Sequence, residues 1–324
     1  MPVNSAVARQ AVACITKFEK RTVDGQSDPF IEAKFWRKHG LFITGSHGSA
    51  IQWQAVTARQ TTRGFDRQTQ SVFTPTNRLI SCSLTNKGYS AVGQVHQTDL
   101  WQCQGDQQLV DLLKHEMQWI PECMWRSIIQ DNYLDGTNTT NSANPIIGLP
   151  GAVKASGSYA GVAYADEPTF FGSGSNVLSG GVHDLFSSDP VPSLTDAILA
   201  AEQGTDAGEG VMEPSAIFMS YTDWAYVHNA LQAQGQGEIT ASKYKTGAKD
   251  IEYMGVPILK SRFVASGTYW VVNHNFMDFR LPTPKVLNSF KREEPSPWSI
   301  ILLMVFYGLQ RFILPRAFVK VTVQ

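Results

Sequence analysis

The amino-acid sequence predicts an α+β fold of two lobes and two extended arms organised around one long helix. Residues 106–133 carry the longest helical pattern in the chain, residues 192–272 alternate helical and strand patterns, and residues 285–323 return to strand patterns. The length of 324 residues is sufficient for two lobes and at least one well-filled core. The long helix is the element to which the other parts are expected to attach.

The composition excludes several classes of protein. Charged residues make up only 17% of the chain, against about 25% in an average soluble protein, and the net charge is −1. A chain built to bind nucleic acid would carry a basic excess. So little charge is typical of a protein that covers much of its surface with partners, although a large core also lowers the charged fraction. The four cysteines lack CxxC spacing, which argues against a zinc site or disulfide framework and favours a reduced compartment, and no signal peptide is visible.

The pattern at 106–133 predicts a rod of roughly 40 Å, which is long for a helix of a compact domain. Asp106 is a suitable N-cap, and Asp135-Gly136 ends the pattern. Pro121 is expected to kink the helix without ending it, because the apolar pattern resumes after it. The apolar stripe, with steps of three and four residues, comprises Leu109, Leu113, Met117, Ile120, Met124 and Ile128.

Residues 1–45 are expected to form an N-terminal arm. A short helix is expected over 4–20, a turn-rich break over 24–29, and an aromatic and basic segment over 30–41. Two interpretations of the last segment stay open: a surface helix of the main domain, or an arm that lies across a neighbouring subunit.

Residues 46–98 predict a long two-stranded ribbon whose tip falls over 61–76. Such a ribbon cannot bury its apolar side alone, so it is expected to lie on a partner, and a solvated hairpin is the alternative. The weakly alternating apolar residues are Ile51, Trp53, Ala55, Leu79, Cys82 and Leu84, and the arginines near the tip are Arg59, Arg63 and Arg67.

Residues 141–190 hold two segments without a regular pattern. The stretch 141–151 is a bend with two prolines, and 152–190 is rich in glycine and serine. The glycines resemble a phosphate-binding loop at first sight, but the Gly-Lys-Ser/Thr ending and the flanking strand and helix are missing. A mobile surface loop is therefore expected over 152–190.

Residues 192–272 predict the second lobe, a mixed sheet flanked by two helices. Ser193 with Asp196 predicts the start of the first helix, and Thr222-Asp223 predicts the start of the second. The expected elements are helices at 193–203 and 224–234, a strand at 214–219, a strand pair kinked at a glycine over 251–259, and a strand at 268–272. Strands at 285–290, 300–307 and 318–323 follow, with a loop at 291–297.

The apolar run 298–314 could be mistaken for a membrane span. It has 17 residues, includes Gln310 and Arg311, and is bounded by Pro297 and Pro315. A helix that crosses a bilayer needs roughly 20 apolar residues. The β-branched and aromatic content of the run favours a pair of buried strands.

No pattern of catalytic or metal-binding residues is visible, so no catalytic residue, cofactor or metal ion is expected. The seven histidines lie apart from one another, without HxH, HExxH or HxxE spacing, and no GxSxG motif occurs. A turn that ends a strand explains His274-Asn275, and adjacent carboxylates such as Asp166-Glu167 point in opposite directions in an extended chain. These absences argue only against enzymes that carry a recognisable motif.

The order of the elements is more informative than any single motif. An arm, a long basic ribbon, a spine helix that ends in Asp135-Gly136-Thr137, and a lobe with a helix–strand–helix run follow one another. The stretches 214–224 (PSAIFMSYTDW) and 255–258 (GVPI) add to this pattern. Taken together, and over nearly the whole chain, it resembles the major capsid protein of tailed bacteriophages, the HK97-type fold.

The resemblance implies a structural protein that assembles into a shell. Copies would meet around five- and six-fold axes, as pentamers and hexamers, and form an icosahedral shell around packaged double-stranded DNA. The implied partners are other copies of the chain, a scaffolding protein, a portal and a decoration protein. Neither membrane binding nor sequence-specific DNA binding is implied. The implied location is a virion capsid, assembled in the host cytoplasm. The implied parts are an N-terminal arm (1–45), an extended loop (46–98), a peripheral domain (99–140 and 276–308) and an axial domain (141–275 and 309–324).

Five residues are expected to contact neighbouring subunits in such a shell. Arg59, Arg63 and Arg67 are expected to meet an acidic surface of a neighbour, and Phe35 and Trp36 are expected to act as apolar anchors. Two other functions stay open: an encapsulin-like compartment on the same fold that houses enzyme cargo, and a hydrolase that uses the α/β lobe for catalysis.

One departure from the family concerns the residues that crosslink subunits. Its best-known member crosslinks subunits through an isopeptide bond between a loop lysine and an asparagine, promoted by a glutamate. Here residues 42–85 contain no lysine, the loop 291–297 contains no asparagine, and residues 301–324 contain no glutamate. No self-catalysed crosslink is therefore expected.

Overall fold

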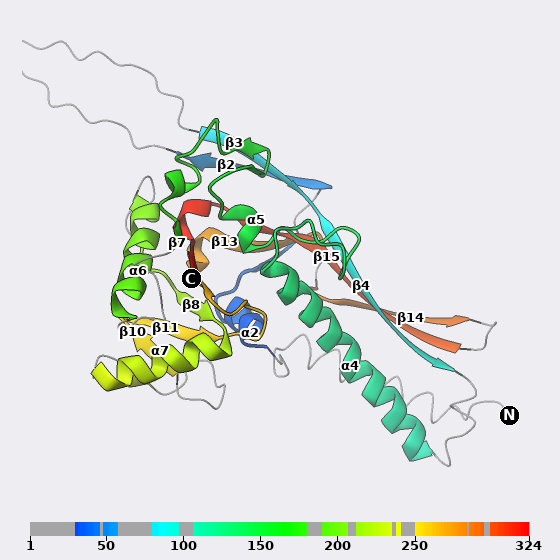
Figure 1. Ribbon diagram of the computed structural model, residues 1–324. Coiled ribbons are helices and arrows are strands. Elements are labelled where there is room, and N and C mark those ends of the chain that lie inside the picture. The colour runs from blue at the N-terminus through cyan, green and yellow to red at the C-terminus, as the bar shows by residue number, and fades with distance from the viewer. Residues whose placement is uncertain are drawn as a thin grey trace, which may run out of the picture. The chain divides into compact units, whose positions relative to one another are not determined.

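The computed structural model of the chain contains two compact units (Figure 1). Unit 1 comprises residues 1–49, 86–148 and 279–310, and unit 2 comprises residues 50–85, 149–278 and 311–324. Each unit is thus assembled from three separate stretches of the chain. The structure describes residues 30–45, 48–57, 79–96, 106–179, 190–206, 212–234, 238–240, 250–283, 285–294 and 299–323.

Helix α4 (Asp106–Asn132) of unit 1 confirms the predicted rod, with 27 residues in one element. It continues through Pro121, as the resumption of the apolar pattern predicted. Ile120, Met124 and Ile128 of the predicted stripe are buried. The other stripe side chains, those of Leu109, Leu113 and Met117, lie outside the described part of the chain.

The predicted stop after the rod is also present. Gly136 has a φ of 84°, a conformation that glycine adopts without strain. Asp135 accepts hydrogen bonds from the backbone N–H and the hydroxyl of Thr137, which closes a local turn. Farther on, Gly148 approaches the helix end so closely that an added Cβ would lie 2.3 Å from the carbonyl oxygen of Asn132.

Unit 1 contains most of a five-stranded sheet with the order β1-β13-β15-β14, in which β4 also pairs with β15. Strand β1 runs parallel to β13, and β15 is antiparallel to both β14 and β4. The strands are β1 (Phe42–Thr44), β4 (Lys87–His96), β13 (Met277–Leu281), β14 (Asn288–Glu294) and β15 (Ser299–Phe312).

Three expectations for this sheet were wrong in detail. The run 298–314 contains one strand of 14 residues instead of two strands, because β15 pairs with β4 over residues 299–308 and also with β14 over residues 299–305. Residues 291–294 extend β14 instead of forming a loop, and residues 87–96, which were expected to belong to the ribbon over 46–98, form strand β4 of this sheet. In the described part of the chain, no helix is both long enough and apolar enough to cross a membrane.

Residues 30–44 belong to the core of unit 1, which corrects the expectation of an arm over this part of 1–45. Helix α2 (Ile31–Lys38) buries Phe35 completely and leaves Trp36 only 2% exposed. The Trp36 ring lies 4.7 Å from that of Phe279 and 6.3 Å from that of Trp125 on α4. These rings pack within the unit because burying them removes a large apolar area from water. The helix expected over 4–20 lies outside the described residues.

Unit 2 is built on a seven-stranded mixed sheet with the order β7-β16-β12-β8-β11-β10-β9. Its central strands are continuous apolar runs, and all four residues of β8 are buried, as is typical of a sheet covered on both faces. The strands are β7 (Val177–Ser179), β8 (Ala216–Met219), β9 (Glu238–Thr240), β10 (Asp250–Tyr253), β11 (Val256–Lys260), β12 (Thr268–Val272) and β16 (Val319–Thr322).

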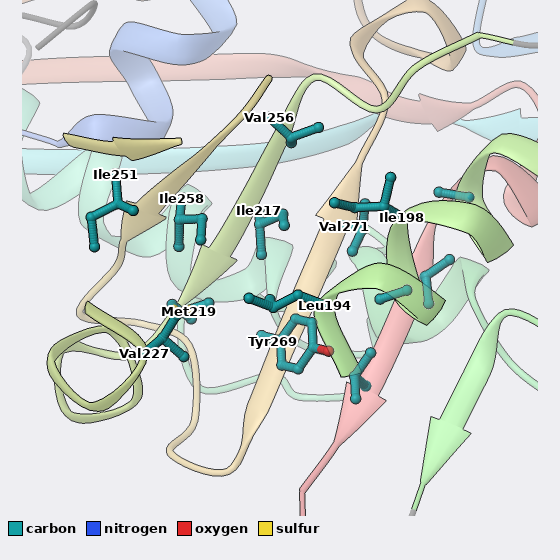
Figure 2. Close-up of a cluster of buried hydrophobic side chains, with 14 of the residues drawn as sticks. Leu194, Ile198, Ile217, Met219, Val227, Ile251, Val256, Ile258, Tyr269 and Val271 are labelled. Carbon is teal, nitrogen blue, oxygen red and sulfur yellow. The ribbon is translucent and has the colours of Figure 1, made fainter. Parts of the chain in front are cut away.

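Helices α6 (Val191–Asp206) and α7 (Tyr221–Gln234) supply the apolar core on one face of this sheet. Figure 2 shows Leu194 and Ile198 of α6 and Val227 of α7 directed toward the side chains of the central strands. The predicted helix–strand–helix run and the mixed sheet of the second lobe are therefore confirmed. The strand side chains in this cluster include Ile217, Met219, Ile251, Val256, Ile258, Tyr269 and Val271.

The helix starts in unit 2 differ from the predicted caps. Helix α7 begins at Tyr221, and the hydroxyl of Ser220 accepts a hydrogen bond from the backbone N–H of Asp223. The carboxylate of Asp223 instead accepts from the backbone N–H of Gly267 at 2.9 Å. Ser193 lies inside α6, where its hydroxyl bonds to that of Tyr269 at 2.8 Å. Both predicted caps were thus drawn into tertiary hydrogen bonds, which local spacing does not reveal.

The glycine kink expected within 251–259 is a two-residue hairpin turn. Strands β10 and β11 are antiparallel, and Tyr253 pairs with Val256. Met254 and Gly255 between them have φ angles of 51° and 79°. Two consecutive positive φ values are the geometry that joins antiparallel strands most tightly.

Strands β2 (Ala50–Val56) and β3 (Leu79–Thr85) are the two strands of the predicted ribbon and belong to unit 2. They are antiparallel, and Trp53 pairs with Cys82. Trp53, Ala55, Cys82 and Leu84 are buried as the alternation predicted, but Leu79 is 50% exposed because the inward row of β3 falls on even-numbered residues. The expected tip at 61–76 lies outside the described residues.

Residues 152–179 are ordered, which corrects the expectation of a mobile surface loop over this part of 152–190. Phe170 and Phe171 are completely buried, and Tyr159 is almost completely buried. The elements here are α5 (Leu149–Ala152), β5 (Ser158–Tyr159), β6 (Val162–Ala163), the 3₁₀ turn η1 (Gly172–Gly174) and β7. The glycines of this segment form turns between its short elements. Buried aromatic side chains pack these elements against the rest of unit 2.

Candidate assembly surfaces

The first candidate surface is the ribbon root, defined here as strands β2 and β3 with the residues of unit 2 that hold them. The backbone N–H of Ser83 donates to the carbonyl oxygen of Ala160 at 2.9 Å. The guanidinium of Arg311 lies over the ring of Trp53, 5.4 Å from its centre. The two ribbon strands therefore start from a fixed place on their own unit, and the expected contact of the ribbon with a partner stays a prediction.

A buried ion pair supports this place. The Nε of Arg311 donates to Oδ1 of Asp278 at 2.9 Å, and Nη2 makes a second, shorter bond to Oδ2. Both side chains are more than nine-tenths buried. Such a two-point pair gives a buried arginine both charge balance and a fixed orientation.

Arg316 holds the outgoing strand of the ribbon. Its guanidinium donates to the carbonyl oxygens of Val56, Thr57 and Thr169, at 3.2, 3.1 and 3.2 Å. The side chain is 4% exposed, and desolvation by burial lowers the pKa of the guanidinium. In the described part of the chain, carbonyl oxygens alone bind this guanidinium, and its Nε has no partner.

The second candidate surface is the open face of the unit 1 sheet, defined as Val92 on β4 with Ile301, Leu303, Val305 and Tyr307 on β15. Val92 pairs with Leu303 and Ser90 with Val305, so these side chains share one face of the sheet. Val92 is 60% exposed and Tyr307 is 40% exposed. The other three residues of this face, Ile301, Leu303 and Val305, are partly exposed. A row of apolar side chains in solvent is the usual sign of a contact surface.

The other face of the same strands is filled by helix α4. Tyr89 pairs with Phe306 across the strands, and its hydroxyl donates to Oδ2 of Asp131 on α4 at 2.6 Å. The Tyr89 hydroxyl also accepts from the backbone N–H of Ile146 at 2.8 Å, and Asn141 donates to Oδ1 of Asp131 at 2.6 Å. Burial raises the pKa of the Asp131 carboxyl group, and the two hydrogen bonds to it offset part of that rise. Burial also raises the pKa of the Tyr89 hydroxyl.

Unit 2 exposes a smaller aromatic surface beside helix α7. Tyr221 is 56% exposed, and Lys260 at the end of β11 lies 4.7 Å from the ring centre of Trp224 and 5.9 Å from that of Tyr221. The Trp224 ring also stacks on His228 at 5.0 Å. A cation over exposed aromatic rings suits contact with another protein, although each such pair contributes little by itself.

No group of three or more metal-ligating side chains occurs among the described residues. His274 and Ser215 bond to each other at a 3₁₀ turn (His274–Phe276) that Asn273 caps, which confirms the predicted strand-ending turn. Burial raises the pKa of the Cys82 thiol to about 11, which disfavours the thiolate form of this buried cysteine.

The residues expected to contact neighbours are not brought together in the described structure. Phe35 and Trp36 are core residues of unit 1, so in this conformation neither ring is available as an anchor. Arg59, Arg63 and Arg67 lie outside the described residues. The sequence analysis did not predict the open face, because Val92 is an apolar residue on the outward row of β4 and interrupts the alternation of polar and apolar residues.

Comparisons with known proteins identify the fold. No protein-family model and no curated protein matches the sequence. The structure matches the cyanophage A-1(L) capsid asymmetric unit with a TM-score of 0.67 at 14% identity, over 88% of this chain and 92% of that chain. It matches the capsid of Myoviridae phage XM1 with a TM-score of 0.56 at 15% identity, over 89% and 91%. It also matches the SrpI encapsulin of Synechococcus elongatus PCC 7942 with a TM-score of 0.54 at 14% identity, over 89% and 86%.

These matches extend over most of the chain and include both units. They agree with the mixed α+β architecture of the structure as a whole. At such low identity the likeness shows the fold alone, and the fold is the one that the order of elements predicted. The chain therefore has the HK97-type fold of phage major capsid proteins, which an encapsulin shell protein shares.

Proposed function

We propose that this chain is a major capsid protein, a structural subunit that assembles with its own copies into hexamers and pentamers of an icosahedral shell. The observation that carries the proposal is the match to a phage capsid subunit over 88% of this chain and 92% of that chain.

The two candidate surfaces supply a physical reason for assembly. The open face exposes apolar side chains whose burial against another copy would be favourable, at roughly 25 cal/mol per Å². A ribbon that starts from a fixed root can reach a neighbouring copy while the body of its own subunit makes other contacts. Weak contacts made at several places on one subunit hold it far more firmly than any one of them alone.

The domain roles follow the family. Unit 1, with the spine helix, serves as the peripheral domain, and unit 2, with the helix–strand–helix run, serves as the axial domain around five- and six-fold axes. The ribbon reaches over the adjacent subunit, with Arg59, Arg63 and Arg67 against an acidic surface of it. The net charge of −1 suits a shell wall that encloses DNA without gripping it.

Other components would act with the subunit in the proposed pathway. A scaffolding protein sets the curvature of the growing shell, and a portal admits double-stranded DNA. A decoration protein is a further proposed partner, since one phage capsid structure that this chain resembles contains decoration proteins. The location that follows is the virion capsid, after assembly in the host cytoplasm.

An encapsulin-like compartment is the second candidate function, because the match to the SrpI encapsulin has nearly the same coverage as the phage matches. The two functions differ in what the shell encloses. Shells purified from the native host would contain packaged DNA in the first case and an enzyme cargo in the second, and mass spectrometry with nuclease digestion distinguishes them.

The proposal is tested by changing the charge of the ribbon. Replacing Arg59, Arg63 and Arg67 together by glutamate should leave the subunit folded, by circular dichroism, and should prevent shell formation, by electron microscopy. The matched control replaces the same three residues by lysine, which keeps the charge and should permit assembly. Normal shells from the glutamate variant would refute the proposed role of these arginines.

The missing crosslinking residues give a second test. Shells boiled in detergent should separate into single chains on a gel, because residues 42–85 contain no lysine to form the isopeptide bond. A ladder of covalent oligomers would show that another lysine takes its place.

A further inference from the structure

We propose that Arg316 is a positioning residue that sets the direction in which the ribbon leaves unit 2 before the subunit meets any neighbour. This role rests on the proposed shell function in one respect: the direction matters because the ribbon must reach an adjacent copy. It differs from the earlier expectation that a partner alone orders the ribbon.

The position of the three bonded carbonyl groups supports this role. Val56 is the last residue of β2 and pairs with Leu79, the first residue of β3. Thr57 follows directly, and beyond it the chain continues toward the tip. Arg316 therefore binds the outgoing strand at the point where the described ladder ends.

The third carbonyl group links this point to a rigid part of unit 2. Thr169 directly precedes the completely buried Phe170 and Phe171. Arg316 itself sits in the 3₁₀ turn η4 (Pro315–Ala317), between completely buried Phe312 and Phe318, whose rings lie 5.1 Å apart. The guanidinium thus joins the ribbon to two segments that the core already fixes.

The surroundings of η4 leave little freedom to move. A Cβ on Gly204 of α6 would lie 1.9 Å from the carbonyl oxygen of Arg316, and a Cβ on Gly172 would lie 3.2 Å from the Cβ of Arg316. Glycine at both positions permits this close approach. The backbone that carries the guanidinium is therefore held on both sides.

The chemistry of the contact requires arginine. A planar guanidinium presents several N–H groups in fixed directions, so it can bind three carbonyl oxygens at once, whereas a lysine ammonium acts as a point charge. Burying such a charge among neutral acceptors is costly, because desolvation disfavours the charged form. By contrast, Arg311, which lies over Trp53, is balanced by the carboxylate of Asp278. Arg316 has no carboxylate partner among the described residues, so its burial is better explained by the orientation that it provides than by a gain in stability.

Hydrogen exchange on the unassembled subunit tests the proposal. Arg316→Met should speed amide exchange in residues 50–57 and 79–85 by about tenfold or more, while exchange in core strand β8 stays unchanged. Arg316→Lys should give an intermediate effect and serves as the informative variant if Arg316→Met does not fold. Lys320→Met is the matched control: it removes a positive charge four residues away that lies over Trp270, and it should leave the ribbon strands as in the wild type.

Electron microscopy of the same variants tests the consequence for assembly. Arg316→Met should give open, irregular or mixed-size particles under conditions in which the wild type and Lys320→Met give uniform shells. Three results for Arg316→Met would each overturn the proposal. The first is unchanged amide exchange at the ribbon strands, and the second is an equal change in exchange across the whole subunit. The third is uniform shells from a subunit whose ribbon strands exchange faster. If the wild type forms no shells, the proposed function fails, and the exchange result alone decides whether Arg316 fixes the ribbon.

Discussion

The ribbon root of unit 2 and the open face of unit 1 are both candidate surfaces, but the root buries its key side chains and the open face exposes them. At the root, two buried arginines bind a carboxylate and three carbonyl oxygens of their own chain. On the open face, Val92 and Tyr307 extend apolar side chains into solvent. The difference indicates two roles: the root fixes the ribbon strands within the subunit, and the open face is available for contact with another copy.

The largest effect is expected at the root, where Asp278→Ala removes the partner of Arg311. A buried guanidinium without its carboxylate should lower the free energy of unfolding by about 3–5 kcal/mol, measured by urea denaturation of the unassembled subunit. The double variant Asp278→Leu/Arg311→Met removes both charges and should lose less than the single variant. A loss below about 1 kcal/mol for Asp278→Ala would show that solvent reaches the pair.

A single added methyl group tests how tightly the root is held. Gly204→Ala places a Cβ against the carbonyl oxygen of Arg316 and should destabilise the subunit by about 1–3 kcal/mol, although alanine normally favours a helix over glycine. Gly88→Ala in β4 is the control, because its Cβ would lie 3.6 Å from the nearest atom, Cδ2 of Tyr307, an ordinary contact distance. Thermal unfolding measures both, and equal stability of the two variants would contradict the close packing at η4.

Removing a buried hydrogen-bonding group from the inner face of the unit 1 sheet should also lower the free energy of unfolding. Tyr89→Phe leaves one oxygen of Asp131 and the backbone N–H of Ile146 without their partner. The expected loss is about 1–3 kcal/mol, because buried polar groups are left unsatisfied. Chemical denaturation of the variant beside the wild type checks this, and a neutral result would mean that water replaces the hydroxyl.

Asp131 also predicts a pH dependence. Its pKa in the folded state is raised above the ordinary value of about 3.8, so the folded state binds the proton more tightly than the unfolded state does. The stabilisation from this group is complete below the unfolded pKa and is lost as pH rises through the folded pKa. Asp131→Asn should remove this decline from a plot of unfolding free energy against pH. Identical slopes in the two proteins would exclude Asp131 as its source.

The smallest effect on stability, and a large one on assembly, is expected on the open face. Val92→Asp should change the free energy of unfolding by less than about 0.5 kcal/mol, since the side chain is already exposed. The new charge should nevertheless prevent subunits from joining, because burying it against another copy is unfavourable. Val92→Thr preserves the shape and should assemble. Size-exclusion chromatography separates the outcomes, and shells from Val92→Asp would remove the open face from the interface.

Sequence patterns predicted the elements whose periodicity is strong and whose partners are near in sequence. The rod at 106–133, the strand pair at 251–259 and strand β12 are present within a residue or so of their predicted ends. The predictions failed where residues far apart in the sequence determine the hydrogen bonds and the packing of a side chain. Ser193 and Asp223 bond across the fold instead of capping helices, and the aromatic residues of α2 face Phe279 and Trp125, which lie far along the chain.

The candidate surfaces were only partly visible in the sequence for the same reason. Alternation identified the ribbon strands, but nothing near Val56 indicates that a guanidinium 260 residues later will bind its carbonyl group. Strand β4 lacks a clear alternation, because Ala91 and Gly93 on its inward row are small and Val92 on its outward row is apolar. Long-range hydrogen bonds and small inward residues leave no local pattern to read.

Electron microscopy of the purified wild-type chain, at concentrations and salt conditions that promote association, is the direct test of shell assembly. Closed icosahedral particles with visible hexamers and pentamers are expected. A chain that remains a monomer under all such conditions, with its ribbon packed against its own body, would contradict the proposed function.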